Sequence, residues 1–366
     1  MQDHSRRLPV APEQIDLREL VGRAPLAFDI SYLKKHLTGR RILVTGAGGS
    51  IGENLSEMLL SFEPSSLILV DHHELSLFQL VRRLSSRSCP TSVEALLADV
   101  RDRGKLARMF QEHHPEVVFH LAAYKHVHIG EANSDEVFTA NVLGTVNMVE
   151  ESVRAGVQRF VYVSTDKAVD PVSVYGGTKR IVELLVAAIK QERTATTFSI
   201  VRLVNTVGAS GGVIRVFAEQ IGQRQPITVT HPEMTRYWIS MDEAIKFLSL
   251  AACVDEVPGL LVLNMGEPVR LMDVADKMWE LVGDPEHPLK ITYVGLRPGE
   301  RLHERVAGDT ETVTATPHPG VLEVRGSALA PIGLSDLLAR IAEISEQASR
   351  GDLTELRRRI AALAAL

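Results

Sequence analysis

The sequence predicts an α/β protein with a doubly wound parallel sheet and a smaller C-terminal substrate-binding lobe. Short apolar runs alternate with helix-like stretches, which is typical of βαβ units. A glycine-rich turn joins the first apolar run to the first long helix. The length of 366 residues also exceeds that of one average domain. Together these observations favour a large α/β domain that carries a second, smaller unit.

The predicted elements follow one another in a regular order. Strands are expected at residues 41–46, 66–70, 95–98, 117–121, 160–164 and 198–203. Helices are expected at residues 29–37, 53–60, 135–155, 175–191, 218–224, 240–252, 271–282 and 352–366. Right-handed crossovers between parallel strands then place helices on both faces of the sheet.

The regular alternation of strand-like and helix-like segments ends after about residue 204, and this change predicts the domain boundaries. We expect an N-terminal extension (1–40), a dinucleotide-binding domain (41–204, with 238–265 returning to it), a substrate-binding lobe (205–237 and 266–330) and a C-terminal helical tail (331–366). The last helix is amphipathic, so it either packs on its own subunit or contributes to an oligomer. We expect a homo-oligomer.

The composition excludes several classes of protein. There are 40 Lys and Arg against 46 Asp and Glu, a net charge of −6, so no chain-wide basic field supports nucleic-acid binding. Cys89 and Cys253 lie far apart, which argues against a disulfide framework and fits a cytoplasmic protein. No apolar run is long enough for a membrane span, and the 13 histidines lack the spacing of a metal site.

Residues 45–52, Thr-Gly-Ala-Gly-Gly-Ser-Ile-Gly, have the spacing of a dinucleotide-binding loop. Gly46 permits a tight turn, Gly48 or Gly49 lets the backbone approach a pyrophosphate, and Gly52 lets the helix pack closely on the strand. The candidate cofactor-binding residues are Gly46, Gly48, Gly49, Ser50, Ile51, Gly52, Asp71, Asp99, Val100, Ala122, Tyr175 and Lys179.

Asp71 indicates which dinucleotide this loop binds. It ends the second predicted strand, 19 residues after Gly52, where a carboxylate accepts hydrogen bonds from ribose hydroxyls. The same carboxylate would repel a 2′-phosphate, and no arginine follows it directly. The sequence therefore predicts NAD, with NADP disfavoured, and Asp99 is a candidate contact to the adenine.

A second pattern points to proton transfer at an alcohol. Tyr175 and Lys179 are four residues apart, so both side chains lie on one face of a helix. A nearby ammonium lowers the pKa of a tyrosine, which then accepts a proton from a hydroxyl as hydride leaves its carbon. Thr165, or its neighbour Ser164, would hold the same oxygen at the end of the preceding strand.

These motifs resemble those of the extended short-chain dehydrogenase/reductases. More narrowly, the chain resembles the CapD-like polysaccharide-biosynthesis group, whose type case is a UDP-N-acetylglucosamine 4,6-dehydratase. The resemblance covers about residues 15–310, with matching text at residues 44–52, 120–127, 141–145, 164–168, 230–237, 266–269 and 295–301. It implies a Rossmann domain and a lyase that makes a 4-keto-6-deoxy sugar nucleotide, with a small-molecule UDP-N-acetylhexosamine as its partner.

The resemblance also assigns roles to a neighbouring acid and amine. Oxidation at C4 acidifies the C5 proton, which Lys167 would remove while Asp166 protonates the departing C6 hydroxyl. Hydride would then return to C6. Two alternatives stay open: a UDP-sugar 4-epimerase, which needs Tyr175 but no base for C5, and a catalytically silent NAD-binding regulator.

A nucleoside diphosphate sugar also needs cationic and polar contacts. Guanidinium groups match phosphate oxygens in pairs, and residues that follow sheet strands face the ligand crevice. The candidate substrate-binding residues are Lys125, His126, Asn205, Arg236, Arg297 and Glu300.

Overall fold

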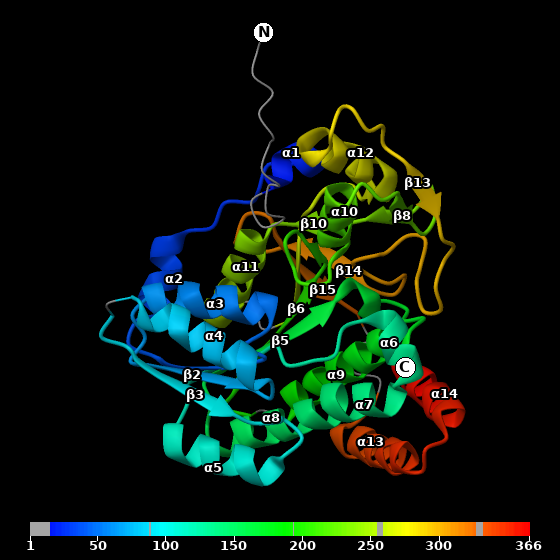
Figure 1. The fold of residues 1–366 in the computed structure, drawn as a ribbon. Helices are drawn as coiled ribbons and strands as arrows, with labels where there is room; N and C mark the ends of the chain where they lie inside the picture. Colours follow the sequence, from blue (N-terminus) through cyan, green and yellow to red (C-terminus); the bar gives the residue numbers. More distant parts are fainter. Residues whose placement is uncertain (1–14, 88, 193, 255–258, 327–331) are drawn as a thin grey trace.

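The structure, a computed structural model, describes residues 15–87, 89–192, 194–254, 259–326 and 332–366. A large sheet with helices on both faces forms the main body, and a smaller lobe lies at the top in Figure 1. Over the part of the chain that is described, no helix combines the length and the apolar character needed to cross a bilayer.

The main sheet has nine strands in the order β14-β15-β11-β6-β5-β4-β1-β2-β3. Neighbouring strands from β3 to β11 are parallel, whereas β15 and β14 are antiparallel additions at one edge. The bounds are β1 Arg41–Thr45, β2 Ser66–Asp71, β3 Ser92–Leu97, β4 Val117–His120, β5 Arg159–Thr165, β6 Thr197–Leu203, β11 Leu260–Leu263, β14 Thr312–Ala315 and β15 Val321–Arg325. The parallel part is a doubly wound sheet, as the sequence predicts, which confirms the fold class.

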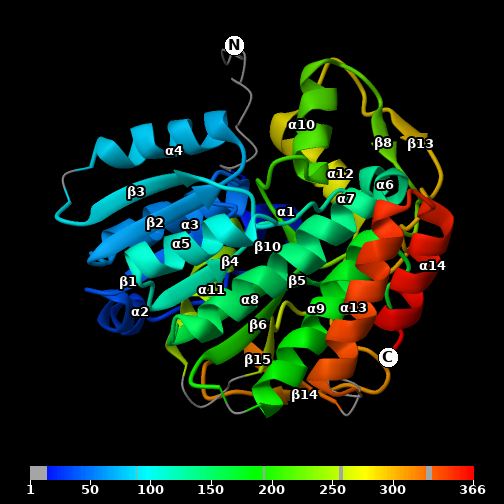
Figure 2. The same cartoon turned by 90° about the horizontal axis from the view of Figure 1, so that it is seen from below.

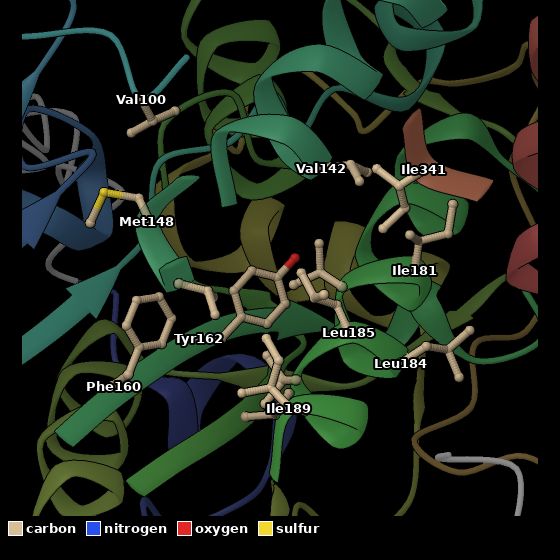
Figure 3. Packing of buried hydrophobic residues seen from close by; sticks show 14 of the residues in the cluster. Val100, Val142, Met148, Phe160, Tyr162, Ile181, Leu184, Leu185, Ile189 and Ile341 are labelled. Atoms are coloured by element: carbon tan, nitrogen blue, oxygen red, sulfur yellow. The ribbon is translucent and has the colours of Figure 1, made fainter. Parts of the chain in front are cut away.

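Helices cover both faces of this sheet because its strands alternate their apolar side chains. Ile42 and Val44 of β1 pack into the core on one face and Leu43 into the core on the other. The first face carries α2 Ile30–Leu37, α3 Ser50–Ser61, α4 Glu74–Ser85 and α11 Met241–Cys253. The second face carries α5 Arg103–His113, α7 Ser134–Phe138, η2 Thr139–Leu143, α8 Gly144–Arg154, α9 Val174–Gln191, α13 Leu334–Ser349 and α14 Leu353–Ala364. Figure 3 shows part of the second core, where Tyr162 of β5 lies beside Leu185 of α9.

The smaller lobe has a separate hydrophobic core, which includes Phe217, Trp238 and Met278. Its elements are α1 Leu17–Val21, α10 Val213–Gly222, α12 Leu271–Val282 and the short strands β7 Asn205–Thr206, β8 Ile227–Val229, β9 Thr235–Arg236, β10 Trp238–Ile239, β12 Val269–Arg270 and β13 Ile291–Tyr293. α6 Val127–Ala132 and the 3₁₀ turn η3 Asp166–Ala168 follow strands of the main sheet. The N-terminal segment thus contacts both units, α1 in the lobe and α2 on the main body.

The predicted lobe 266–330 requires a correction. Its second half includes β15, which pairs with β11, and β14, which pairs with β15, so both strands extend the main sheet. Val321 and Val324 of β15 are buried, one in each core of the main body. In contrast, α11 and β11 return to the main sheet, as the sequence predicts for residues 238–265.

The C-terminal tail packs on its own chain. α13 and α14 lie along α9 (Figure 2), and Leu356, Ile360 and Leu363 of α14 are buried there. Gly177 of α9 makes this close packing possible, since a Cβ at that position would lie 2.9 Å from Cγ2 of Ile360. Of the two alternatives for the amphipathic last helix, the structure therefore shows packing on its own subunit.

Some element boundaries differ from those predicted. β3 begins at Ser92 instead of residue 95. The apolar pattern does not show this start, because the strand is a half-exposed edge strand and carries the polar Glu94. α10 spans 213–222 instead of 218–224, since Gly212 caps it at its start. The predicted helix 135–155 is divided by the π-helical η2.

Candidate active site

Residues from separate parts of the sequence meet at the carboxyl ends of the parallel strands. Gly46 follows β1, Asp71 ends β2, Ala122 follows β4 and Thr165 ends β5. Doubly wound sheets bind ligands at this edge, near the point where the strand order reverses, which here lies between β1 and β4. The predicted cofactor and catalytic residues therefore share one edge of one sheet.

The glycine-rich loop has no room for side chains. Gly46 is in the left-handed region (φ +65°), and a Cβ there would lie 2.8 Å from the backbone nitrogen of Ala122. A Cβ on Gly52 would lie 2.1 Å from the carbonyl oxygen of Gly46. Gly49 caps α3 without a side-chain hydrogen bond, so the N–H groups of the first turn can bind an anion.

A cavity of about 280 Å³ opens beside this loop. Asp71 is 8% exposed; its Oδ2 accepts a hydrogen bond from the nitrogen of Gly48 at 2.9 Å and its Oδ1 one from that of His73 at 2.9 Å. The predicted cofactor residues that line the cavity are Gly46, Gly48, Gly49, Asp71, Asp99, Val100 and Ala122. The other five, Ser50, Ile51, Gly52, Tyr175 and Lys179, are not among its lining residues. The cradle of glycines, the helix N-terminus and the buried carboxylate together fit a dinucleotide.

Arg101 also lines this cavity, and sequence reasoning missed it. Its guanidinium binds Asp99 (Nη2 to Oδ2, 2.7 Å) and Glu136 (Nη1 to Oε2, 2.8 Å). The hydrogen bond from Arg101 lowers the pKa of Asp99. Asp99, the candidate contact to the adenine, therefore lines the cavity as part of an ion pair. The sequence signal for Arg101 was its position two residues after Asp99.

An ion pair follows the end of β5. Nζ of Lys167 donates to Oδ1 of Asp166 at 2.9 Å, and the hydroxyl of Thr165 donates to the same oxygen at 2.9 Å. Asp166 is fully buried, whereas the Lys167 side chain is 23% exposed. Burial lowers the pKa of Lys167, but the negative charges of Asp166 and, when it is ionised, Glu304 outweigh this effect and hold that pKa above its ordinary value. Lys167 therefore rests as an ammonium.

Tyr175 and Lys179 lie one turn apart on α9, as the spacing predicts. Burial raises the pKa of Tyr175, and Lys167 and a hydrogen bond with Thr165 act against this rise. Burial lowers the pKa of Lys179 to about 7. Its Nζ donates to the carbonyl oxygen of Val163 at 2.8 Å and lies 4.7 Å from the ring centre of Tyr162.

The two candidates for the alcohol-binding hydroxyl have different surroundings. Ser164 donates to the carboxylate of Glu183 at 2.6 Å, beneath the site, whereas Thr165 is beside Asp166 and Tyr175. Glu183 is fully buried and lies one turn after Lys179 on the same helix. The structure therefore favours Thr165 over Ser164 as the hydroxyl at the reacting oxygen.

Glu304 is a further site residue that sequence reasoning missed. Its Oε1 lies 3.8 Å from Nζ of Lys167, and the residue is 5% exposed. It comes from the segment between β13 and β14, more than a hundred residues after Lys167 in the chain. Only the fold brings it to the Asp166–Lys167 pair, and its place three residues after the predicted motif 295–301 was the only sequence signal.

The substrate-binding candidates form several hydrogen bonds within the protein. Arg236 is buried and donates to the carbonyl oxygens of Thr235, Arg301 and Leu302. Lys125 donates to the carbonyl oxygen of Ser210 at 2.8 Å.

The remaining candidates also contact other residues of the chain. The ring of His126 packs against Gly211, and Asn205 donates to the carbonyl oxygen of Tyr237 at 3.3 Å. Arg297 is exposed, and its backbone nitrogen donates to the Glu300 carboxylate at 3.2 Å. Their contacts with substrate stay predictions. Over the described part of the chain, no three His, Cys, Asp or Glu side chains form a group that could hold a metal ion.

The parallel sheet, the glycine-rich loop after β1 and the Tyr175/Lys179 helix define an extended short-chain dehydrogenase/reductase. The family model described as "Polysaccharide biosynthesis protein" matches residues 42–325. The chain belongs to this family and is CapD-like.

Curated relatives support this assignment. The chain is 37% identical over 301 residues to the capsular polysaccharide biosynthesis protein CapD of Staphylococcus aureus, which covers 82% of this chain and 50% of that protein. The chain thus spans about half the length of this relative. It is also 30% identical over 278 residues to an inverting UDP-N-acetylglucosamine 4,6-dehydratase of Campylobacter jejuni, which covers 73% of this chain and 77% of that protein.

Solved structures share the fold. Pen from Bacillus thuringiensis superimposes with a TM-score of 0.71 at 26% identity and covers 81% of this chain and 88% of its own. The dTDP-glucose 4,6-dehydratase DesIV from Streptomyces venezuelae, solved with NAD bound, gives a TM-score of 0.63 at 20% identity and covers 86% of this chain and 99% of its own.

Proposed function

We propose that the protein is an NAD-dependent nucleotide-sugar 4,6-dehydratase that acts on a UDP-N-acetylhexosamine, with UDP-N-acetylglucosamine as the expected substrate. The observation that carries this proposal is the Asp166–Lys167 ion pair (2.9 Å) beside Thr165 and Tyr175. It provides an acid and a base in addition to the groups that alcohol oxidation needs. The relatives named as 4,6-dehydratases support the same reaction and nucleotide.

The residues divide the chemistry between two steps. Tyr175, as the phenolate, takes the proton of the C4 hydroxyl, with Thr165 holding the same oxygen. Lys167 and the positive charge of a bound nicotinamide would favour this phenolate against the rise in pKa that burial causes. NAD, held by the glycine-rich loop and Asp71, would accept hydride from C4 and return it to C6. The C4 ketone acidifies the C5 proton, and Lys167 then removes it while Asp166 protonates the departing C6 hydroxyl.

The Asp166–Lys167 pair balances the protons of the elimination. Transfer of one proton from the Lys167 ammonium to the Asp166 carboxylate gives a neutral amine and a carboxylic acid, which are the base and the acid required. Removal of the C5 proton and protonation of the leaving oxygen then restore the ammonium and the carboxylate. Elimination of one water thus needs no proton from outside the pair.

The first test is conversion of UDP-N-acetylglucosamine by the purified protein with bound NAD and no added NADH. The expected product is one water lighter than the substrate. An unchanged mass with UDP-, GDP- and dTDP-sugars would contradict the proposal. NMR of the product formed in deuterated water then reports deuterium at C5 and the configuration there.

Lys167→Ala separates this function from its alternative, a UDP-sugar 4-epimerase, which relatives named UDP-glucose 4-epimerase favour. A dehydratase variant without Lys167 loses water elimination but still oxidises C4, whereas an epimerase keeps full turnover. Tyr175→Phe loses both activities. Lys277→Ala on the surface of α12 serves as the matched control.

A further inference from the structure

Glu304 places a second carboxyl group near the ammonium of Lys167, which already pairs with Asp166. It follows His303, whose backbone bridges to Thr235, and its side chain is buried. Oε1 of Glu304 is 3.8 Å from Nζ of Lys167, whereas Oδ1 of Asp166 is 2.9 Å from it. Asp166 is therefore the ion-pair partner of Lys167, and Glu304 is a surplus acid next to the pair.

Two oxygens in this cluster are buried without a hydrogen-bond partner among the described residues: Oε2 of Glu304 and Oδ2 of Asp166. A buried carboxylate oxygen without a donor is costly when the group is ionised and much less so when it is protonated. The geometry therefore disfavours two ionised carboxylates around one ammonium.

The charged groups around Glu304 come from several elements. Lys167 and Asp166 follow β5, Arg236 is on β9, and Arg301 precedes Glu304 in its own segment. Both arginines donate to backbone carbonyl oxygens, Arg301 to that of Val169 at 2.9 Å. Burial and the Asp166 charge raise the pKa of Glu304, and Lys167, Arg236 and Arg301 only partly offset this rise.

The phenols of the site face the same ion pair. The charges of Lys167 and Asp166 act on Tyr175 in opposite directions, and the Asp166 charge also raises the pKa of Tyr237, after burial and Glu267. Neither phenol adds a positive charge to the cluster, so the cations that act on Glu304 are Lys167, Arg236 and Arg301.

We propose that Glu304 is a positioning residue that acts through Lys167: it works as the neutral carboxylic acid and, once ionised, locks Lys167 in the ammonium form. This inference rests on the proposed dehydratase function. With Glu304 neutral, the Lys167 proton moves to Asp166 and frees the amine for the C5 proton. With Glu304 ionised, a second negative charge 3.8 Å away stabilises the ammonium and opposes that transfer.

The proposal predicts the pH dependence of turnover. The neutral form of Glu304 is lost as pH rises through its raised pKa, so kcat of the wild-type enzyme falls over that range. Glu304→Gln permanently resembles the neutral acid. We expect it to retain kcat within about threefold at the acidic end and to lack the alkaline fall, because no ionisation remains at this position.

Two further variants make this result interpretable. Glu304→Asp keeps a titrating carboxyl group and should keep an alkaline fall. Glu280→Gln makes the same change at an exposed residue of α12 that pairs with Lys277, and should match wild type. An alkaline fall in Glu304→Gln equal to that of wild type, or loss of its activity at every pH with native unfolding behaviour, would overturn the proposal.

A second measurement does not depend on turnover. The rate at which acetic anhydride acetylates Lys167, followed by mass spectrometry from pH 6 to 10 in the substrate-free protein, reports the fraction of neutral amine. We expect acetylation at alkaline pH to be about tenfold faster in Glu304→Gln than in wild type. Equal rates would refute the role of Glu304, whereas failure of the proposed function would appear as absent turnover in wild type with the acetylation difference intact.

Discussion

The guanidinium of Arg202 binds both carboxylate oxygens of Glu183, with Nε 2.8 Å from Oε1 and Nη2 2.7 Å from Oε2. Both side chains are fully buried. Arg202 also binds Glu311 and the carbonyl oxygen of Val306, in the segment that carries Glu304. Because Glu183 in turn accepts from Ser164, this pair connects the end of β5 to that segment.

Arg202→Met should destabilise the protein strongly. It leaves the Glu183 and Glu311 carboxylates buried; among the described residues, Arg180 is the remaining cation that contacts both, at 3.2 Å from each. Loss of one member of a buried ion-pair network costs about 3–5 kcal/mol in the free energy of unfolding. Urea unfolding measures this. Lys277→Met, at an exposed ion pair with Glu280, is the control and should cost less than about 1 kcal/mol; equal effects of the two changes would contradict this prediction.

Lys179 should make the stability of the protein depend on pH. Burial lowers its pKa to about 7, so between pH 7 and the ordinary lysine pKa the unfolded chain binds a proton that the folded protein lacks. The free energy of unfolding of wild type relative to Lys179→Met should therefore rise with pH, by about 2 kcal/mol from pH 7 to 9. Urea unfolding of both proteins at each pH tests this, and a difference that is constant or falls with pH would refute it.

Gly48→Ala should weaken cofactor binding. A Cβ at this position would lie 2.6 Å from Cβ of Ser76 and 3.2 Å from Oδ2 of Asp71, so the carboxylate that faces the cavity must move. Overpacking of this kind costs about 1–3 kcal/mol, which corresponds to a loss of NAD affinity of about 5- to 150-fold, measured by calorimetry. Gly222→Ala, at a position with no neighbour within 4 Å, should leave the affinity unchanged. Equal affinities of the two variants would contradict the assigned role of the loop.

The sequence contained enough information for the features that depend on local spacing. The glycines at 46–52, the carboxylate of Asp71 and the one-turn separation of Tyr175 and Lys179 need only one strand, one turn or one helix to be recognised. The parallel arrangement of the strands, with helices on both faces, follows from the repeated βαβ units and their fixed handedness.

Features that depend on contacts between distant segments could not be predicted. Glu304 and Arg202 find their partners far away in the chain, and nothing local distinguishes them from surface charges. β14 and β15 also lie in a stretch without helical crossovers, so the periodicity does not show that they rejoin the main sheet as antiparallel strands.

The return of β14 and β15 to the main sheet affects how the lobe can be studied and how it can move. The polypeptide enters and leaves the lobe repeatedly, through residues 22–29, 204, 240, 264–268 and 294–311. No single cut yields the lobe as one continuous fragment, so it cannot be excised for separate expression. A rigid-body rotation of the lobe would also have to bend all of these connections at once, including the one that holds Glu304 beside Lys167.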